Sequence, residues 1–252
     1  MRWPKHRQHY ITCFCCPPNT LRTLCQAQEY AYAVTGSTLY VNLYGQNNLK
    51  TKDLEVEQTT DYPWDGKVKL TIKRAKALGT VVLHIPSWCD KYEVKVNGEP
   101  ATVPADAPAG AIPLSRKWKK GDVIELNLDM RARLVEANPL VEEAKNQVAV
   151  MRGPIVYCLE GQDVANGNRI NDIALPADIR LTETQMTIEG HTFTALEGDA
   201  LLTNTTAWNN QTLYRELTKP AQQQKVRIRL IPYYAWDNRG IQDMSLWLPL
   251  AR

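Results

Sequence analysis

The sequence of 252 residues lacks any apolar run that approaches the ~20 residues of a membrane span. Its first ten residues are basic but lead into no apolar segment, so we expect no secretory signal peptide there. The sequence also lacks a large excess of charge of either sign: it contains 30 Lys and Arg and 27 Asp and Glu, which gives a net charge of +3. These absences predict a protein with neither a membrane nor a nucleic acid as its partner.

The six cysteines do not suggest a disulfide framework, because three of them crowd into four positions. Cys25, Cys89 and Cys158 are isolated, and we expect them to fill core space. This usage favours a reducing compartment and therefore the cytoplasm, although nothing else in the sequence determines the localisation.

The clustered cysteines are Cys13, Cys15 and Cys16, and Pro17 and Pro18 follow them directly. Vicinal cysteines form a disulfide only with strain, whereas thiolates are soft metal ligands and strong nucleophiles. Each proline fixes φ, removes an N–H and restricts the residue before it. The cluster therefore favours a metal or redox role over a packing role.

One helix and many strands are predicted after the cluster. Asn19 or Thr20 can cap a helix that runs to about Val34, and Gly36 is a natural stop. From Ser37 onward short segments alternate apolar and polar residues, which is typical of strands in antiparallel β-sandwiches. We expect strands near residues 39–44, 54–60, 67–73, 79–85, 92–97 and 123–128, and, after a boundary near 136–139, near 147–159, 187–193, 212–215, 225–231 and 244–249.

Five motifs resemble glycoside hydrolase family 127, bacterial enzymes typified by β-L-arabinofuranosidase. They are CCPPN at 15–19, YVNLY at 40–44, DYPWDGKV at 61–68, RGPIVYCLE at 152–160 and PYYAWDNRG at 232–240. The resemblance runs from end to end of the chain and in the family's order.

The resemblance implies a fold as well as a family. Family members resemble an (α/α)6 barrel followed by two β-sandwiches, with the second sandwich inserted into the first. Residues 1–35 would then be a remnant of the catalytic barrel with its last helix. Residues 36–136 plus 238–252 would form the first antiparallel β-sandwich, and residues 137–237 the second. The expected fold class is mainly β.

The resemblance also implies chemistry. Cys15 inherits the role of the nucleophile in a retaining mechanism, and Cys15 and Cys16 inherit the role of zinc ligands. A zinc ion holds a coordinated thiol as thiolate near neutral pH. The substrate of the complete enzyme would be an arabinofuranoside or a related sugar.

Other parts of the family's site have no match in this sequence. The acid/base glutamate, and the glutamate and cysteine that complete the zinc site, precede the Cys-Cys motif in the family. Here none of the fourteen residues before Cys15 is acidic. The resemblance therefore implies a truncated homologue that is inactive on its own. It would leave the helix face of Leu21, Leu24 and Ala31 exposed and available for self-association.

The alternative is a non-catalytic β-sandwich module that binds zinc or carbohydrate. His6 and His9, together with the three clustered cysteines, could form a local zinc knuckle. Sugar binding could use Trp64, Trp88, Trp208 or Trp236, although tryptophans in sandwiches usually serve the core.

Overall fold

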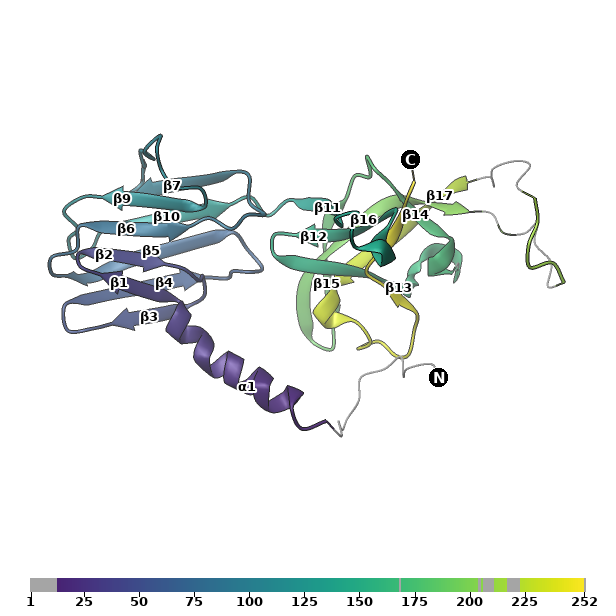
Figure 1. The fold of residues 1–252 in the computed structure, drawn as a ribbon, viewed down its shortest axis with the longest axis horizontal. Helices are drawn as coiled ribbons and strands as arrows, with labels where there is room; N and C mark the ends of the chain where they lie inside the picture. Colours follow the sequence, from purple (N-terminus) through teal and green to yellow (C-terminus); the bar gives the residue numbers. More distant parts are fainter. Residues whose placement is uncertain (1–12, 168, 204, 206–210, 217–222, 252) are drawn as a thin grey trace. The chain divides into compact units, whose positions relative to one another are not determined.

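The computed structural model describes residues 13–167, 169–203, 205, 211–216 and 223–251. The described residues divide into two compact units, the first ending at Met130 and the second beginning at Arg131. β-strands are the main regular secondary structure of each unit, and most of them are labelled in Figure 1. The expectation of a mainly β protein is confirmed. Among the described residues, no helix combines the length and the apolar composition needed to cross a membrane.

The α-helix α1 (Cys16–Gln26) opens the first unit and continues as the 3-10 turn η1 (Ala27–Tyr30). The predicted helix end near Val34 is wrong, because Val34 lies in β1 (Tyr32–Thr35) and pairs with Leu39 of β2 (Thr38–Val41). Gly36 lies in the turn between these strands, with φ of 57°. Strand pairing overrides the local helical spacing here.

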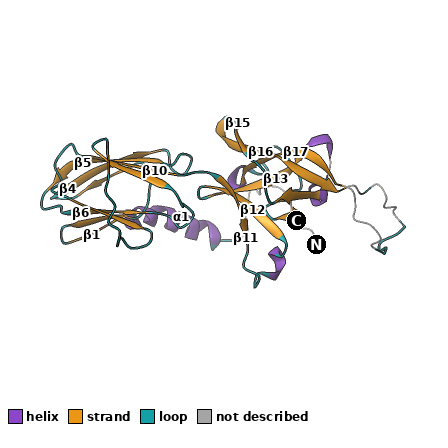
Figure 2. Cartoon of the chain, turned by 90° about the horizontal axis from the view of Figure 1, so that it is seen from above, coloured by secondary structure: helices purple, strands orange, loops and turns teal. Residues whose placement is uncertain are grey.

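Two sheets make up the rest of this unit, and Figure 2 shows them as separate layers. The four-stranded sheet has the order β1-β2-β6-β9, with β6 at Thr80–His84 and β9 at Ala111–Ser115. The six-stranded sheet has the order β3-β4-β5-β10-β7-β8, and its strands are β3 (Asn47–Lys50), β4 (Leu54–Thr60), β5 (Lys67–Ala75), β10 (Val123–Leu128), β7 (Tyr92–Val96) and β8 (Glu99–Pro100). Strands β2 and β6 are parallel, so the expectation of a wholly antiparallel sandwich is wrong at this pair.

One hydrophobic core joins the two sheets. Leu39 and Leu83 of the four-stranded sheet belong to the same buried cluster as Ile72 and Leu126 of the six-stranded sheet. Successive residues of a strand point to opposite faces, so burying the apolar face leaves the polar residues on the outside. This alternation explains why the predicted strand positions agree closely with the observed ones in this unit.

The second unit contains a single nine-stranded sheet. Its strands are β11 (Ala132–Glu136), β12 (Gln147–Arg152), β13 (Ile155–Val164), β14 (Ile173–Pro176), β15 (Thr182–Ile188), β16 (His191–Thr203), β17 (Gln223–Pro232), β18 (Met244–Ser245) and β19 (Leu248–Ala251). The short 3-10 turns are η2 (Glu142–Ala144), η3 (Ala165–Gly167), η4 (Ile170–Asp172) and η5 (Tyr233–Ala235). Residues 212–215, which were expected to be a strand, belong to no strand.

This sheet closes on itself. Pairing of β12 with β13 completes a ring of six strands in the order β12, β19, β14, β16, β17, β13. Leu159, Leu175 and Leu230 from three of these strands lie in one buried cluster. A closed sheet has no free edges within the ring. Residues 137–237 therefore contribute to one closed sheet, where two facing antiparallel sheets were expected.

The last strand lies in the second unit, although it was expected in the first. Strand β19 pairs antiparallel with β12 and parallel with β14, both in the second unit. The expectation that residues 238–252 return to the first sandwich is therefore wrong. Leu248, which is 1% exposed, packs in the core of the second unit and fixes the strand there. The two units also divide at Met130 and Arg131, a few residues before the predicted boundary.

A buried ion network ties β13 to the turn that follows η5. The Arg239 guanidinium donates from Nε to Glu160 at 3.1 Å and from one terminal nitrogen to Asp163 at 3.0 Å, and its other terminal nitrogen contacts both carboxylates. The Asp237 backbone N–H also donates to Glu160 at 2.7 Å. The Glu160 and Asp163 side chains are only 1% and 3% exposed. Both carboxylates therefore depend on Arg239 for their counter-charge.

We predict that Arg239→Met destabilises the second unit by about 3–5 kcal/mol, because two buried carboxylates lose their cation. Urea unfolding followed by tryptophan fluorescence measures the change. The matched control is Arg227→Met, which removes a half-exposed arginine 3.3 Å from Glu197 and Asp199. That exposed pairing is worth about 1 kcal/mol or less. Equal losses in the two variants would contradict the assignment.

Candidate functional site

The three clustered cysteines lie at the start of α1. Cys13 precedes the helix, Cys15 is its N-cap residue and Cys16 is its first residue. Pro17 and Pro18 occupy the first turn, where the backbone N–H that a proline lacks would have no partner within the helix. The Asn19 N–H donates to the Cys15 carbonyl at 3.2 Å and closes this turn. The local backbone thus holds Cys15 and Cys16 side by side.

The three sulfur atoms converge. The Sγ of Cys13 lies 3.0 Å from that of Cys15 and 3.7 Å from that of Cys16, and the Cys15 and Cys16 sulfurs are 3.5 Å apart. All three side chains are exposed, and no disulfide joins them. Within the described part of the chain, this is the one group of three or more His, Cys, Asp or Glu side chains close enough together to hold a metal ion. No carboxylate or imidazole of the described residues joins it.

Hydrogen bonds within the cluster shift the pKa values of Cys13 and Cys16 in opposite directions. A hydrogen bond from the Cys15 side chain, together with backbone hydrogen bonds, lowers the pKa of Cys13 to about 6. The same side chain of Cys15, followed by that of Cys13, raises the pKa of Cys16. The N-terminus of a helix carries partial positive charge, which favours a thiolate nearby. The cluster therefore holds negative charge on sulfur at neutral pH.

This donor set fits zinc. Zinc binds thiolate sulfur at about 2.3 Å in tetrahedral geometry, which sets neighbouring sulfurs about 3.8 Å apart. The separation of 3.5 Å between Cys15 and Cys16 is close to that edge. The structure thus brings together the two residues expected as ligands, and it adds Cys13, which the resemblance did not assign. The C-x-C-C spacing is the signal in the sequence that points to Cys13.

The other three cysteines have different surroundings. Cys89 and Cys158 are buried, and burial raises the pKa of both thiols, to about 12 for Cys158. They fill core space as expected. Cys25 lies on α1 and is exposed, so the expectation of a core position is wrong for this residue. No residue of α1 is buried, and Leu21 and Leu24 are 63% and 66% exposed. Self-association through this face stays a prediction, which light scattering would test.

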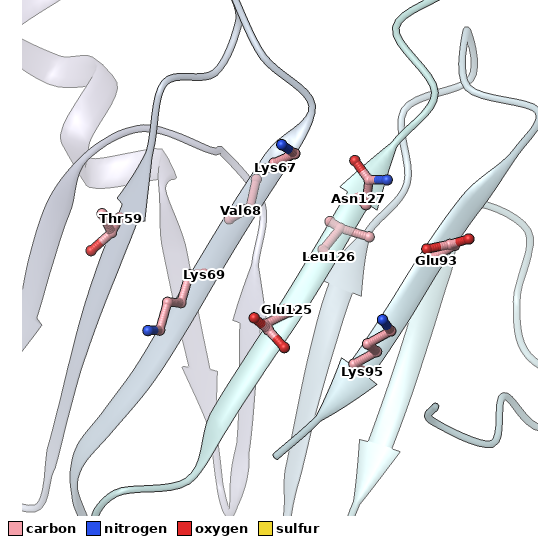
Figure 3. Close-up of a pocket in the computed structure, with 9 residues that line it drawn as sticks. All are labelled: Thr59, Lys67, Val68, Lys69, Glu93, Lys95, Glu125, Leu126 and Asn127. Carbon is pink, nitrogen blue, oxygen red and sulfur yellow. The ribbon is translucent and has the colours of Figure 1, made fainter. Parts of the chain in front are cut away.

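A shallow pocket of about 270 Å³ lies on the outer face of the six-stranded sheet (Figure 3). Side chains from four adjacent strands line it, and Glu125 of β10 lies directly across from Lys69 of β5 and Lys95 of β7. The lining residues are Thr59, Lys67, Val68, Lys69, Glu93, Lys95, Glu125, Leu126 and Asn127. No aromatic ring lines the pocket. Its charged lining is the polar outer face that the alternation of these strands requires.

The tryptophans considered for sugar binding occupy different places. Trp64 is 50% exposed, Trp88 packs against the core of the first unit, and Trp208 lies outside the described residues. Trp236 lies nearly parallel to Tyr233, with an interplanar angle of 17° and ring centroids 6.4 Å apart. Tyr233 and Tyr234 are 41% and 47% exposed. These rings lie on the turn that the buried network of Arg239 holds.

The two β units and the preceding helix together are similar to part of the structures of glycoside hydrolases. A solved structure described as a glycoside hydrolase has a TM-score of 0.88 and 50% identity, and the match covers 100% of this chain and 42% of that chain. Residues 38–130 match the middle-domain model of family 127, named for β-L-arabinofuranosidase, and residues 132–249 match the family's C-terminal-domain model. The chain belongs to glycoside hydrolase family 127, and it corresponds to the C-terminal portion of the family.

Two further relatives agree with this membership. The crystal structure of a family 127 β-L-arabinofuranosidase from Geobacillus stearothermophilus T6 has a TM-score of 0.87 and 34% identity, covering 99% of this chain and 39% of that chain. The non-reducing end β-L-arabinofuranosidase of Bifidobacterium longum subsp. longum is 32% identical over 263 aligned positions, which cover 96% of this chain and 38% of the relative. The chain thus spans about two fifths of the length of the relatives it matches.

We predict that iodoacetamide modifies Cys13 rapidly at pH 7 in reduced, chelator-treated protein. The reactive form is the thiolate, and a pKa of about 6 means that most of this thiol is ionised at pH 7. The rate should fall as the pH drops below 6 and level off above 7. Peptide mass mapping measures it, with buried Cys158 as the unreactive internal control. A rate that rises about tenfold from pH 7 to 8, as for an ordinary thiol of pKa near 8.5, would contradict the prediction.

Proposed function

We propose that this chain is the C-terminal part of a retaining glycoside hydrolase of the β-L-arabinofuranosidase kind, with Cys15 as the nucleophile and Cys16 as a zinc ligand. The observation that carries the proposal is the pair of adjacent sulfurs, 3.5 Å apart at the N-terminus of α1, in a chain of family 127. The substrate class is an arabinofuranoside or a related sugar, by analogy with the names of the relatives.

In this mechanism the Cys15 thiolate attacks the anomeric carbon of the sugar. A carbon–sulfur bond forms while the bond to the leaving oxygen breaks, and that oxygen takes a proton from a general acid. Water then cleaves the glycosyl-enzyme, and the sulfur leaves as thiolate again. A zinc ion, when bound, lowers the pKa of the coordinated thiol and stabilises the sulfur as a leaving group. Within the chain, the turn that contains Pro17 and Pro18 holds Cys15 at the N-terminus of α1.

The proposal also implies that this chain alone does not turn over substrate. Retaining hydrolysis needs a second group as acid and then as base. No carboxylate of the described residues joins the three sulfurs, and the segment before Cys15 contains no Asp or Glu. Glu29, the first carboxylate after the cluster, lies in η1 beyond the C-terminal end of α1. The acid/base role is therefore one that this chain does not supply beside Cys15.

We expect no hydrolysis of an alkyl β-L-arabinofuranoside by the chain in reducing buffer with zinc, measured by release of L-arabinose. A 2,4-dinitrophenyl glycoside needs no protonation of its leaving group, so it tests the nucleophile separately. Mass spectrometry should find a pentosyl adduct on Cys15 in preference to Cys25, an exposed cysteine on the same helix. Turnover of the alkyl glycoside that Cys15→Ser abolishes would refute inactivity. Equal labelling of Cys15 and Cys25 would refute the nucleophile.

A second candidate function is a carbohydrate-binding module, and the Tyr233–Trp236 pair favours it. A sugar ring presents a face of C–H groups, which packs well on the electron-rich face of an aromatic ring. The half-exposed Tyr233 ring and the partly buried Trp236 ring, which are nearly parallel, offer such a surface. The turn that carries them is held by the buried contacts of Arg239 and by the Asp237 N–H, so little order has to be gained on binding.

For this second function we expect arabinan in a native gel to retard the chain without being cleaved. Tyr233→Ala should restore most of the mobility, since it removes one ring of the pair while leaving Trp236 in its partly buried place. The matched control is Tyr214→Ala, which removes a tyrosine of the same unit that is 90% exposed. No retardation, or the same loss in both variants, would eliminate the module.

A further inference from the structure

Three sulfur atoms, rather than two, converge at the candidate metal site. The Sγ atoms of Cys13 and Cys16 are 3.7 Å apart, and those of Cys15 and Cys16 are 3.5 Å apart. One triangular face of a tetrahedral thiolate site has edges of about 3.8 Å. Two edges of the observed triangle are therefore already close to that size. The third, 3.0 Å between Cys13 and Cys15, has to lengthen by a small side-chain rotation.

We propose that Cys13 is a third sulfur ligand, so that Cys13, Cys15 and Cys16 together bind one thiophilic divalent metal ion. This inference rests on the zinc role proposed for Cys15 and Cys16 and extends it. The resemblance gives Cys13 no role, and neither of the two functions described above uses it beyond packing beside the other sulfurs.

The local structure keeps the loss of conformational entropy small when the three sulfurs come together. Cys15 and Cys16 belong to the start of one helix, and the Asn19 N–H, donated to the Cys15 carbonyl, fixes their relative positions. Cys13 is separated from Cys15 by a single residue, so few torsions have to be ordered to bring its sulfur into place. All three sulfurs are exposed, and a metal ion can therefore reach them from solvent.

Charge and coordination number agree with this assignment. Soft thiolate ligands select metals such as zinc, and three of them leave one position of a tetrahedron for water or another ligand. The first turn of α1 contains no acidic residue that would compete for the ion or repel the thiolates. Three thiolates beside the positive end of a helix dipole are favoured over three in open solvent.

The test is a titration of the reduced chain with Cd²⁺ under anaerobic conditions. Absorption from sulfur-to-metal charge transfer scales with the number of bound thiolates, and it is read independently of any activity. We expect saturation at one Cd²⁺ per chain. Cys13→Ser should lower the absorption by about a third and weaken binding at least tenfold, because even loss of a group that only supports a ligand costs about that much. Competition with Zn²⁺ should likewise show weaker metal binding by Cys13→Ser than by the unaltered chain.

Cys25→Ser is the matched control, since Cys25 is an exposed cysteine on the same helix outside the cluster. It should bind Cd²⁺ like the unaltered chain, and far-ultraviolet circular dichroism should show that every variant is folded. Unchanged binding by Cys13→Ser, with loss in Cys15→Ser and Cys16→Ser, would overturn the third ligand while leaving the proposed function intact. No binding by the unaltered chain, or equal loss in Cys25→Ser, would overturn the site of three sulfurs as such.

Discussion

Burial of the apolar residues of the central strands is the constraint on which both β units depend. The first unit meets it with two sheets that share a core, as Leu39 and Ile72 show from opposite layers. The second meets it by closing one sheet on itself through β12 and β13. Both solutions leave an outer face of polar side chains, which accounts for the charged pocket on the six-stranded sheet. Helix α1 takes no part in either solution, because none of its residues is buried.

The candidate site has a different physical origin from the fold. Its geometry comes from a few consecutive residues, in which two prolines and the start of a helix hold Cys15 and Cys16 in place. Such a site forms without support from a hydrophobic core, and its sulfurs remain exposed. Exposure suits metal capture and thiol chemistry, but glycoside hydrolysis also needs a general acid and the exclusion of water. In the proposed function, the chain supplies the nucleophile, and the general acid has to be a group outside the cluster of three sulfurs.

The second unit contributes rigidity at a place far from the cysteines in the sequence. Glu160 and Asp163 are buried beside Arg239, and this network fixes the turn that exposes Tyr233 and Tyr234. Ion pairs of this kind add little net stability but strongly penalise loss of one partner. A rigid turn with exposed aromatic rings is suited to contact with a flat apolar surface, of which the face of a sugar ring is one example.

Local patterns in the sequence were sufficient to predict many of the strands and the cysteine cluster. Alternation of apolar and polar residues correctly predicted strands such as β4 and β10. The motif at 15–19 located the sulfurs. Tertiary structure alone decided the end of α1, the closure of the second sheet and the place of β19. The reason is that strand partners and converging side chains depend on contacts between residues distant along the chain or on exact backbone torsions, which a periodic pattern does not encode.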